Sequence, residues 1–200
     1  MTTIILWRHG NTDWNNQQRF QGQTDVPLNE RGLTQAVAAA GRLAALNPDL
    51  VVTSDLSRCA ATAAALGDAT GLPVERDVRL RERCFGEWET LTRSEVAQRF
   101  PEAWARWLSG DPHPGCGIEP IADLGKRMAE MIRHTAERVP GKTAVLVTHG
   151  GSTKWGIGAL LGWPEETVET LRGMGNCHWA RLQHDTERGW LLVGYNLGVP

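Results

Sequence analysis

Three short apolar segments, each followed at once by polar residues, most strongly constrain the fold of this chain. They cover residues 4–7, 50–53 and 144–148, and the first ends at the triplet Arg8-His9-Gly10. An apolar run that stops at charge and glycine is typical of a buried strand that leads into a functional loop. In an open α/β sheet, ligands bind beyond the carboxyl ends of parallel strands. We therefore expect these three polar strand ends to meet at one edge of a sheet.

The residues predicted to meet there are Arg8, His9, Arg58 and His149. Arg58 falls in the first turn of an expected helix after the second strand, and His149 directly follows the third strand. Two guanidinium and two imidazole groups held together call for an anion, because like charges would otherwise repel. Phosphate suits this set, since arginine binds its oxygens in pairs and a neutral histidine can attack phosphorus. Nearby arginine charge lowers the pKa of His9, which favours its neutral, nucleophilic form.

The composition excludes several classes of function. The 200 residues are 41% hydrophobic with no shift along the chain, so we expect a single domain over residues 1–200. A formal net charge of -2 argues against a general attraction to nucleic acid or to an anionic membrane. No segment reaches the roughly twenty apolar residues that a membrane span requires. The four scattered cysteines form no Cys-x-x-Cys pair, which favours free thiols and a cytoplasmic location.

Hydrophobic spacing predicts the remaining elements. Helices are expected over residues 29–47, 57–66, 121–139 and 151–161, and further strands over residues 74–77, 179–182 and 190–195. Apolar residues recur at helical spacing in the first of these helices at Leu33, Val37, Ala40 and Leu43. Residues 92–108 are expected to be helical in parts, and residues 111–120 to form a loop. Trp104 and Trp107 could cover a substrate, but ordinary packing is the favoured interpretation.

Four motifs in order along the chain resemble those of the histidine phosphatase (phosphoglycerate mutase-like) superfamily. They are RHG at residues 8–10, SDLSR at 54–58, LRE at 80–82 with FGEWE at 85–89, and THGG at 148–151. Each is weak alone, but together they span nearly the whole chain. The second histidine is followed by glycine, as in one branch of the superfamily. The resemblance implies a phosphoglycerate mutase-like fold of the α/β class, a three-layer α/β/α sandwich with a mostly parallel sheet.

The resemblance also implies a role for each site residue. His9 would carry a phosphohistidine, Arg8, Arg58 and His149 would surround the phosphoryl group, and Glu82 would protonate the leaving oxygen. Another branch has an aspartate acid where this chain has Gly150, so the acid role falls to Glu82. Glu87 and Glu89 are its rivals or surface residues. The residues expected to contact substrate are Asn15, Gln21 and Gly150. The histidines expected to be non-catalytic are His113, His134, His178 and His184.

The leading hypothesis is a metal-independent phosphatase that acts on a small phosphorylated metabolite. No metal or cofactor is expected, because the arginines can neutralise the phosphate charge and no His-Glu-x-x-His spacing is present. A phosphoglycerate mutase-type phosphotransferase is the nearest alternative, although the region over residues 90–120 is short for a mutase. An inactive phospholigand-binding protein is the third. A homodimer is left open, since dimers are common among similar proteins.

Overall fold

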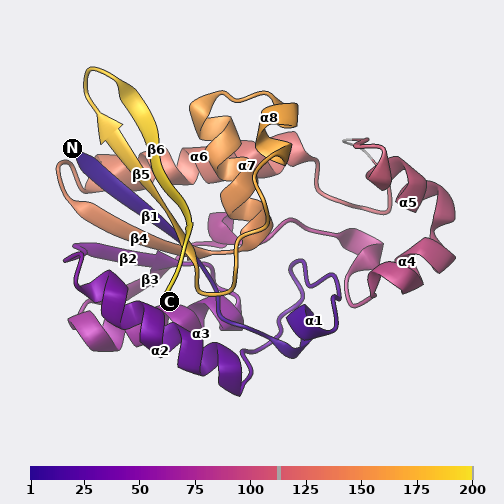
Figure 1. Cartoon of the computed structure of the whole chain (residues 1–200), viewed down its shortest axis with the longest axis horizontal. Coiled ribbons are helices and arrows are strands. Elements are labelled where there is room, and N and C mark those ends of the chain that lie inside the picture. Colours follow the sequence, from indigo (N-terminus) through magenta and orange to yellow (C-terminus); the bar gives the residue numbers. More distant parts are fainter. Residues whose placement is uncertain (112–113, 200) are drawn as a thin grey trace.

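The computed structural model describes residues 1–111 and 114–199, and its strands form one six-stranded sheet (Figure 1). The strand order is β3-β2-β4-β1-β5-β6. The strands are β1 (Thr2–Arg8), β2 (Leu50–Thr53), β3 (Val74–Arg76), β4 (Thr143–Thr148), β5 (Trp179–Asp185) and β6 (Gly189–Leu197). The first four in this order pair in parallel, whereas β5 and β6 are antiparallel. The predicted α/β class with a mostly parallel sheet is thus confirmed.

Helices cover both faces of this sheet, which gives the predicted three layers. α2 and α3 lie on one face, and α6 and α7 lie on the other (Figure 1). The helices are α1 (Asp13–Asn16), α2 (Glu30–Ala44), α3 (Ser57–Thr70), α4 (Arg93–Arg99), α5 (Pro101–Leu108), α6 (Ile121–Arg138), α7 (Gly150–Leu161) and α8 (Glu165–Glu169). Two 3-10 turns, Val78–Leu80 and Gly86–Trp88, lie between β3 and α4. α1 and α8 were not expected.

Strand β1 lies inside the sheet and is buried on both faces, as strands between two helical layers must be. Ile4 and Leu6 pack in the cluster with α6 and α7, whereas Ile5 and Trp7 pack in the cluster with α2 and α3. All four side chains have no exposed surface. This burial fixes the register of β1, since a slip of one residue would exchange its two faces. It therefore also fixes where the chain leaves the sheet after Arg8.

α2 forms where the apolar spacing predicts it, but its buried face differs from that spacing. Leu33 and Val37 are 50% and 68% exposed, while Ala40 and Leu43 are buried. The rest of the buried face consists of small residues, Gly32, Ala36 and Ala39. Small side chains let the alanine-rich α3 approach closely, because the distance between helix axes depends on the residues at the contact. Asn29 caps the helix, accepting a hydrogen bond from the Gly32 amide.

The segment α4–α5 extends beyond the sheet (Figure 1). Its apolar side chains pack in an aromatic cluster with Phe20, Phe85 and Trp88. The ring of Trp88 lies 5.8 Å from that of Trp104 and 5.4 Å from that of Trp107, centroid to centroid. Both tryptophans therefore pack as expected. Of the loop predicted over residues 111–120, residues 112 and 113, including His113, lie outside the described residues. Across the described chain no helix is long and apolar enough to cross a membrane, and all four cysteines are free.

Candidate active site

The ends of β1 and β4 bring the two predicted histidines together. Arg8 pairs with Thr148 in the parallel register, so His9 and His149 leave the sheet at equivalent positions. Their ring centroids are 5.2 Å apart in an edge-on arrangement, and both side chains are almost completely buried. Two histidines that are 140 residues apart in the sequence thus share one site because their strands are neighbours.

His9 is held in one tautomer by its neighbour. Its Nδ1–H donates to the Gly10 carbonyl oxygen at 2.7 Å, which leaves the lone pair of Nε2 available. Burial, with the charges of Arg58 and Arg8, lowers the pKa of His9 well below its usual 6.5. The imidazole is therefore neutral at pH 7, which is the form that can act as a nucleophile.

Arg58 comes from the first turn of α3 and is completely buried. Its Nη1 and Nη2 donate to the carbonyl oxygens of Thr24 and Gly22 at 2.9 and 2.7 Å. Its Nε donates to Nδ1 of His149 at 3.3 Å, so the other nitrogen of His149 carries the proton and donates to the Ser54 hydroxyl at 3.2 Å. Burial, followed by the Arg58 charge, lowers the pKa of His149 well below 6.5.

Two polar atoms of the site are buried with no hydrogen-bond partner in the described part of the chain. They are Nε of Arg8 and Oε1 of Gln21. Arg8 donates through Nη1 to the Met174 carbonyl oxygen, and burial lowers its pKa. Buried polar atoms are rarely left unpaired, so each of these two can pair with a bound water or ligand. Rotating the Gln21 amide would offer two donors in place of the oxygen.

Glu82 reaches the same site from the segment after the 3-10 turn Val78–Leu80. Its carboxylate is held at the first turn of α7 by backbone amides of Gly151 and Ser152, at 3.1 and 3.0 Å. Three arginines, Arg8, Arg19 and Arg58, line the cavity against this one carboxyl group. The site therefore attracts an anion and holds a group that can exchange a proton beside it.

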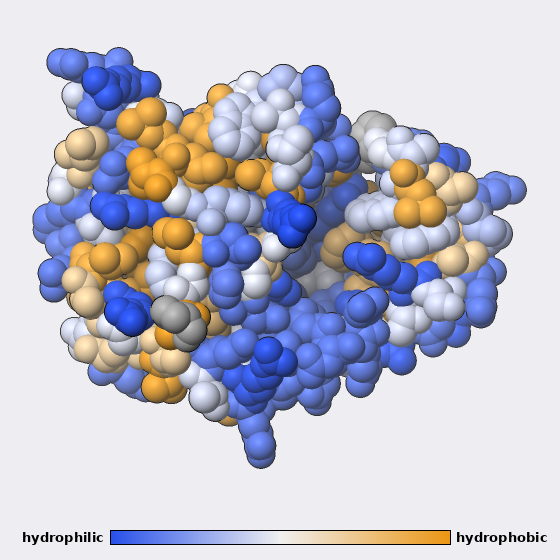
Figure 2. All heavy atoms as spheres, in the orientation of Figure 1, coloured by the Kyte–Doolittle hydropathy of each residue, from blue (hydrophilic) through white to orange (hydrophobic). Residues whose placement is uncertain are grey.

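These side chains line a small cavity of about 150 Å³. Every residue predicted for the site lines it except Gly150, which opens α7 and lies close to the Arg8 side chain. The lining residues are Arg8, His9, Asn15, Arg19, Phe20, Gln21, Gly22, Arg58, Glu82, Phe85 and His149. Figure 2 shows the surface hollowed between the sheet-bearing body and the α4–α5 segment. Neither Trp104 nor Trp107 is among the lining residues.

Two residues that organise the site were not singled out from the sequence. Asn176, in the loop before β5, donates through Nδ2 to the carbonyl oxygens of His9 and Gly10 at 3.2 and 3.1 Å. Arg127 of α6 donates to the Glu82 carbonyl oxygen at 3.0 Å. The sequence does mark Arg127, because it is a charged residue beside Met128 on the apolar face of its helix. No comparable pattern marks Asn176.

Glu89, one of the rivals of Glu82, does not line the cavity but contacts residues that do. Its carboxylate accepts hydrogen bonds from the amides of Gln23 and Thr24 at 3.0 and 2.8 Å. The carbonyl oxygen of Thr24 in turn accepts from Arg58. Glu89 therefore supports the loop that positions Arg58, whereas Glu87 is exposed.

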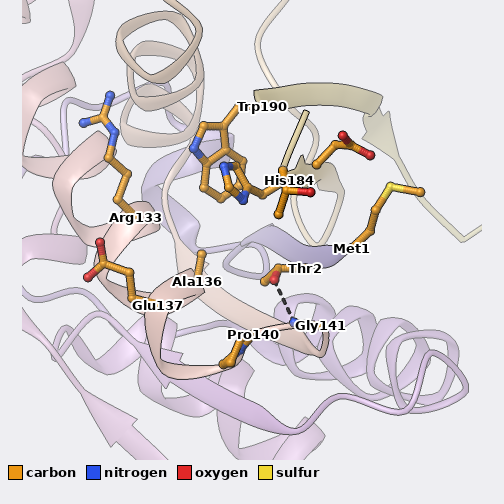
Figure 3. Close-up of a pocket in the computed structure, with 11 residues that line it drawn as sticks. Met1, Thr2, Arg133, Ala136, Glu137, Pro140, Gly141, His184 and Trp190 are labelled. Carbon is orange, nitrogen blue, oxygen red and sulfur yellow. Dashed lines mark hydrogen bonds between the residues drawn. The ribbon is translucent and has the colours of Figure 1, made fainter. Parts of the chain in front are cut away.

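A larger cavity of about 550 Å³ lies at the opposite, amino-terminal ends of β1 and β4 (Figure 3). Its wall contains His184, whose ring packs against Trp190 with centroids 4.9 Å apart, and Thr2, whose hydroxyl accepts from the Gly141 amide. It brings no pair of arginines to a histidine. The predicted chemistry therefore belongs to the smaller cavity. Among the described residues, no three His, Cys, Asp or Glu side chains are placed to hold a metal ion.

The chain is similar to proteins of one family along most of its length. The family model described as the histidine phosphatase superfamily, branch 1, matches residues 4–197. A glucosyl-3-phosphoglycerate phosphatase of Mycolicibacterium vanbaalenii is 40% identical over 193 residues, covering 92% of this chain and 84% of that protein. A probable phosphoglycerate mutase of Yersinia enterocolitica is 34% identical, covering 98% and 90%. The structure of a mycobacterial glucosyl-3-phosphoglycerate phosphatase with VO3 superimposes with a TM-score of 0.90 at 37% identity, covering 98% of this chain and 99% of that one.

Proposed function

The chain belongs to branch 1 of the histidine phosphatase superfamily, and we propose that it hydrolyses a small phosphomonoester, without a metal ion, through a phosphohistidine on His9. The observation that carries this proposal is the state of His9. Its imidazole is neutral, presents Nε2 as a free lone pair, and lines a cavity that also contains Arg8 and Arg58. A neutral nucleophile beside two fixed cations suits attack on a phosphate group.

The reaction proceeds in two displacements at phosphorus. In the first, Nε2 of His9 bonds to phosphorus as the ester P–O bond breaks, and Glu82 gives its proton to the departing oxygen. In the second, a water oxygen attacks phosphorus, the N–P bond breaks, and the Glu82 carboxylate takes a proton from that water. The products are the alcohol and inorganic phosphate, and both side chains return to their initial state.

The cationic side chains stabilise the charge that spreads over the phosphoryl oxygens. Arg8 has an unused Nε–H, and Arg58 retains two N–H groups beyond its three hydrogen bonds. Because these groups are buried, their interaction with the transition state is stronger than it would be in water. His149 acts beside them, and Asn15 and Gln21 contact the substrate. Gly150 keeps the space beside Arg8 open.

The test is release of inorganic phosphate from a panel of phosphomonoesters in the presence of a chelator. Wild-type protein should release phosphate, and acid-labile phosphate should appear on the protein. His9→Ala should lose both signals, whereas His178→Ala, a change in a non-catalytic histidine, should keep them. Full turnover by His9→Ala would refute the proposal. Protein that binds phosphate esters but is never labelled would favour the inactive binding protein.

A mutase is the second candidate, because a relative at 34% identity is named a probable phosphoglycerate mutase. It uses the same phosphohistidine but returns the phosphoryl group to another oxygen of the ligand. Following 3-phosphoglycerate by phosphorus NMR separates the two reactions. Accumulation of 2-phosphoglycerate faster than inorganic phosphate would identify the mutase.

We infer further that the alcohol part of the substrate carries a second negative charge. A cavity of about 320 Å³ shares Asn15, Arg19 and Phe20 with the catalytic cavity and adds Trp14, Gln18 and Arg93. Its lining contains no acidic residue. Arg93 is exposed and has no ion pair among the described residues, so its charge is available to a ligand. The ring face of Trp14 suits a sugar, and a glycosylated phosphoglycerate has both features.

This inference predicts an order of specificity. Glucosyl-3-phosphoglycerate should have a higher kcat/KM than a neutral sugar phosphate, and Arg93→Ala should reduce that preference about tenfold, mainly through KM. Arg99→Ala removes the same charge from the same helix outside the cavity and should leave the preference unchanged. An equal effect of the two variants would refute the subsite.

The proposal also covers the domain organisation, the cellular compartment and the oligomeric state. We propose one domain over residues 1–200, which the family match over residues 4–197 supports. A reducing compartment such as the cytoplasm is favoured by four unpaired thiols. Homodimer formation stays a prediction, which light scattering of the purified protein tests.

A further inference from the structure

The two carboxylate oxygens of Glu82 have different surroundings. Oε1 is within hydrogen-bond distance of three donors, namely the Arg83 amide at 2.9 Å and the Ser152 amide and hydroxyl, each at 3.0 Å. Oε2 has one, the Gly151 amide at 3.1 Å. A carboxylate offers about two lone-pair sites on each oxygen. Oε1 is therefore saturated, while Oε2 keeps a free site.

We propose that Glu82 gives and takes its proton at Oε2, and that Ser152 is a positioning residue whose hydroxyl holds Oε1 away from the substrate. This inference rests on the acid–base role proposed for Glu82 and goes beyond it. An oxygen surrounded by three donors has no place for a proton of its own, because the proton would face another hydrogen atom. The oxygen with one donor can carry a proton towards the cavity.

The Ser152 hydroxyl has one proton and two acceptors. Its Oγ lies 3.0 Å from Oε1 of Glu82 and 2.9 Å from the Arg81 carbonyl oxygen. The side chain is completely buried, so no bulk water competes for this proton. A hydrogen bond to a charged acceptor is roughly twice as strong as one to a neutral acceptor. The hydroxyl therefore points to Oε1 when Glu82 is ionised and is free to turn to Arg81 when Glu82 is protonated.

This arrangement places the hydroxyl in both displacements without making it a reacting group. As the P–O bond breaks, the proton leaves Oε2 for the departing oxygen, and the Ser152 hydroxyl stabilises the charge that appears on the carboxylate. As water attacks the phosphohistidine, Oε2 takes the water proton and the hydroxyl is released. Losing the hydroxyl should therefore slow only those steps that depend on proton transfer.

The dependence on leaving group distinguishes this role from a structural one. Phosphorylation of the enzyme is measured in single turnovers with an alkyl phosphate, whose alkoxide needs a proton, and with p-nitrophenyl phosphate, whose phenolate leaves without one. Ser152→Ala should slow the alkyl reaction about 10- to 100-fold, part of the contribution typical of a general acid. The p-nitrophenyl reaction should slow less than about threefold, and the substrate concentration that gives half the maximal rate should be unchanged for both.

Two further variants complete the experiment. Thr153→Val removes the next hydroxyl in the same buried turn, which has no hydrogen-bond partner in the described part of the chain, and should leave both reactions unchanged. Gly151→Ala keeps the Ser152 hydroxyl but would place a methyl group 2.7 Å from Oε1, so it should reproduce the selective loss even if Ser152→Ala does not fold.

The outcomes separate this inference from the proposed function. Glu82→Gln should show the largest selective loss with the alkyl phosphate, and the absence of that loss would refute the acid role of Glu82 itself. If Glu82→Gln is selective but Ser152→Ala slows both reactions equally, or neither, the positioning role of Ser152 is refuted. A selective loss in Ser152→Ala, Gly151→Ala and Glu82→Gln, with Thr153→Val unaffected, is the expected result.

Discussion

Lowering the pH from 7 to 5.5 should destabilise the free protein through His9 and His149. Both pKa values are lowered in the folded state, by burial first and then by the Arg58 charge. The unfolded chain therefore binds protons below pH 6.5 that the folded chain does not. The stabilising contribution of each histidine is complete above the unfolded pKa and is lost as the pH falls below it.

The magnitude follows from this difference in bound protons. A histidine with a pKa of 6.5 in the unfolded chain, which stays neutral when folded, costs about 1.3 kcal/mol of unfolding free energy between pH 7 and 5.5. Because His9 and His149 behave alike, the two together should cost about 2.5 kcal/mol. This is a large part of the unfolding free energy of a typical domain, which is roughly 5–15 kcal/mol.

The assay is urea denaturation at both pH values in buffer free of phosphate. The measured quantity is the change in unfolding free energy with pH, compared between wild type and a variant carrying His9→Asn and His149→Asn. Ionisable groups that the two proteins share contribute equally to both and cancel in the comparison. The variant should lose about 2.5 kcal/mol of the pH dependence, and each single change about half. His134→Asn, an exposed change on α6, is the control. Equal pH dependence in wild type and double variant would refute the reasoning.

Three further predictions concern the anion, the arginine and the helix contact. Inorganic phosphate at a hundred times its Kd should raise the unfolding free energy by about 2.7 kcal/mol, which a thermal shift measures. A melting temperature that changes with neither phosphate nor sulfate would contradict the anion site. A lysine in Arg58→Lys cannot reproduce the hydrogen bonds to Gly22 and Thr24, so kcat/KM should fall roughly 100- to 1,000-fold. An unchanged kcat/KM would exclude a role for Arg58 in the transition state. Gly32→Ala would place a methyl group 2.1 Å from the Asn11 carbonyl oxygen, and it should lower the unfolding free energy measured in urea by about 1–3 kcal/mol. Gly41 has open space around it in the same helix, so Gly41→Ala should leave the unfolding free energy unchanged or raise it.

The site was predictable where its residues directly follow strands. Arg8, His9 and His149 are placed by β1 and β4, and parallel neighbours necessarily end at the same edge of a sheet. Arg58 follows the same logic one helical turn later. Apolar runs that stop at polar residues are local patterns, so a sequence displays them. The proximity of His9 and His149 needed only the assumption that their strands are adjacent.

Residues that act through the backbone of other segments could not be predicted in this way. Asn176 reaches the carbonyl oxygen of His9 across 167 positions in sequence, and no periodicity marks an amide in an irregular loop. The buried face of α2 also escaped prediction, since hydrophobicity favours Leu33 and Val37 over Gly32. Packing against α3 selects small residues instead, because size rather than hydropathy decides how closely two helices approach.

The orientation of the His9 ring depends on a contact between two glycines, Gly10 and Gly32. A Cβ on Gly10 would lie 2.5 Å from the carbonyl oxygen of Gly32, so the loop after β1 touches the first turn of α2 backbone to backbone. This contact holds the Gly10 carbonyl oxygen where it accepts from Nδ1 of His9, and that hydrogen bond leaves Nε2 free for phosphorus. A Cβ at Gly32 would likewise lie 2.1 Å from the Asn11 carbonyl oxygen, so a side chain at either glycine would force the two segments apart. Both glycines therefore help to position His9, and a hydropathy pattern does not mark them because it depends on side chains.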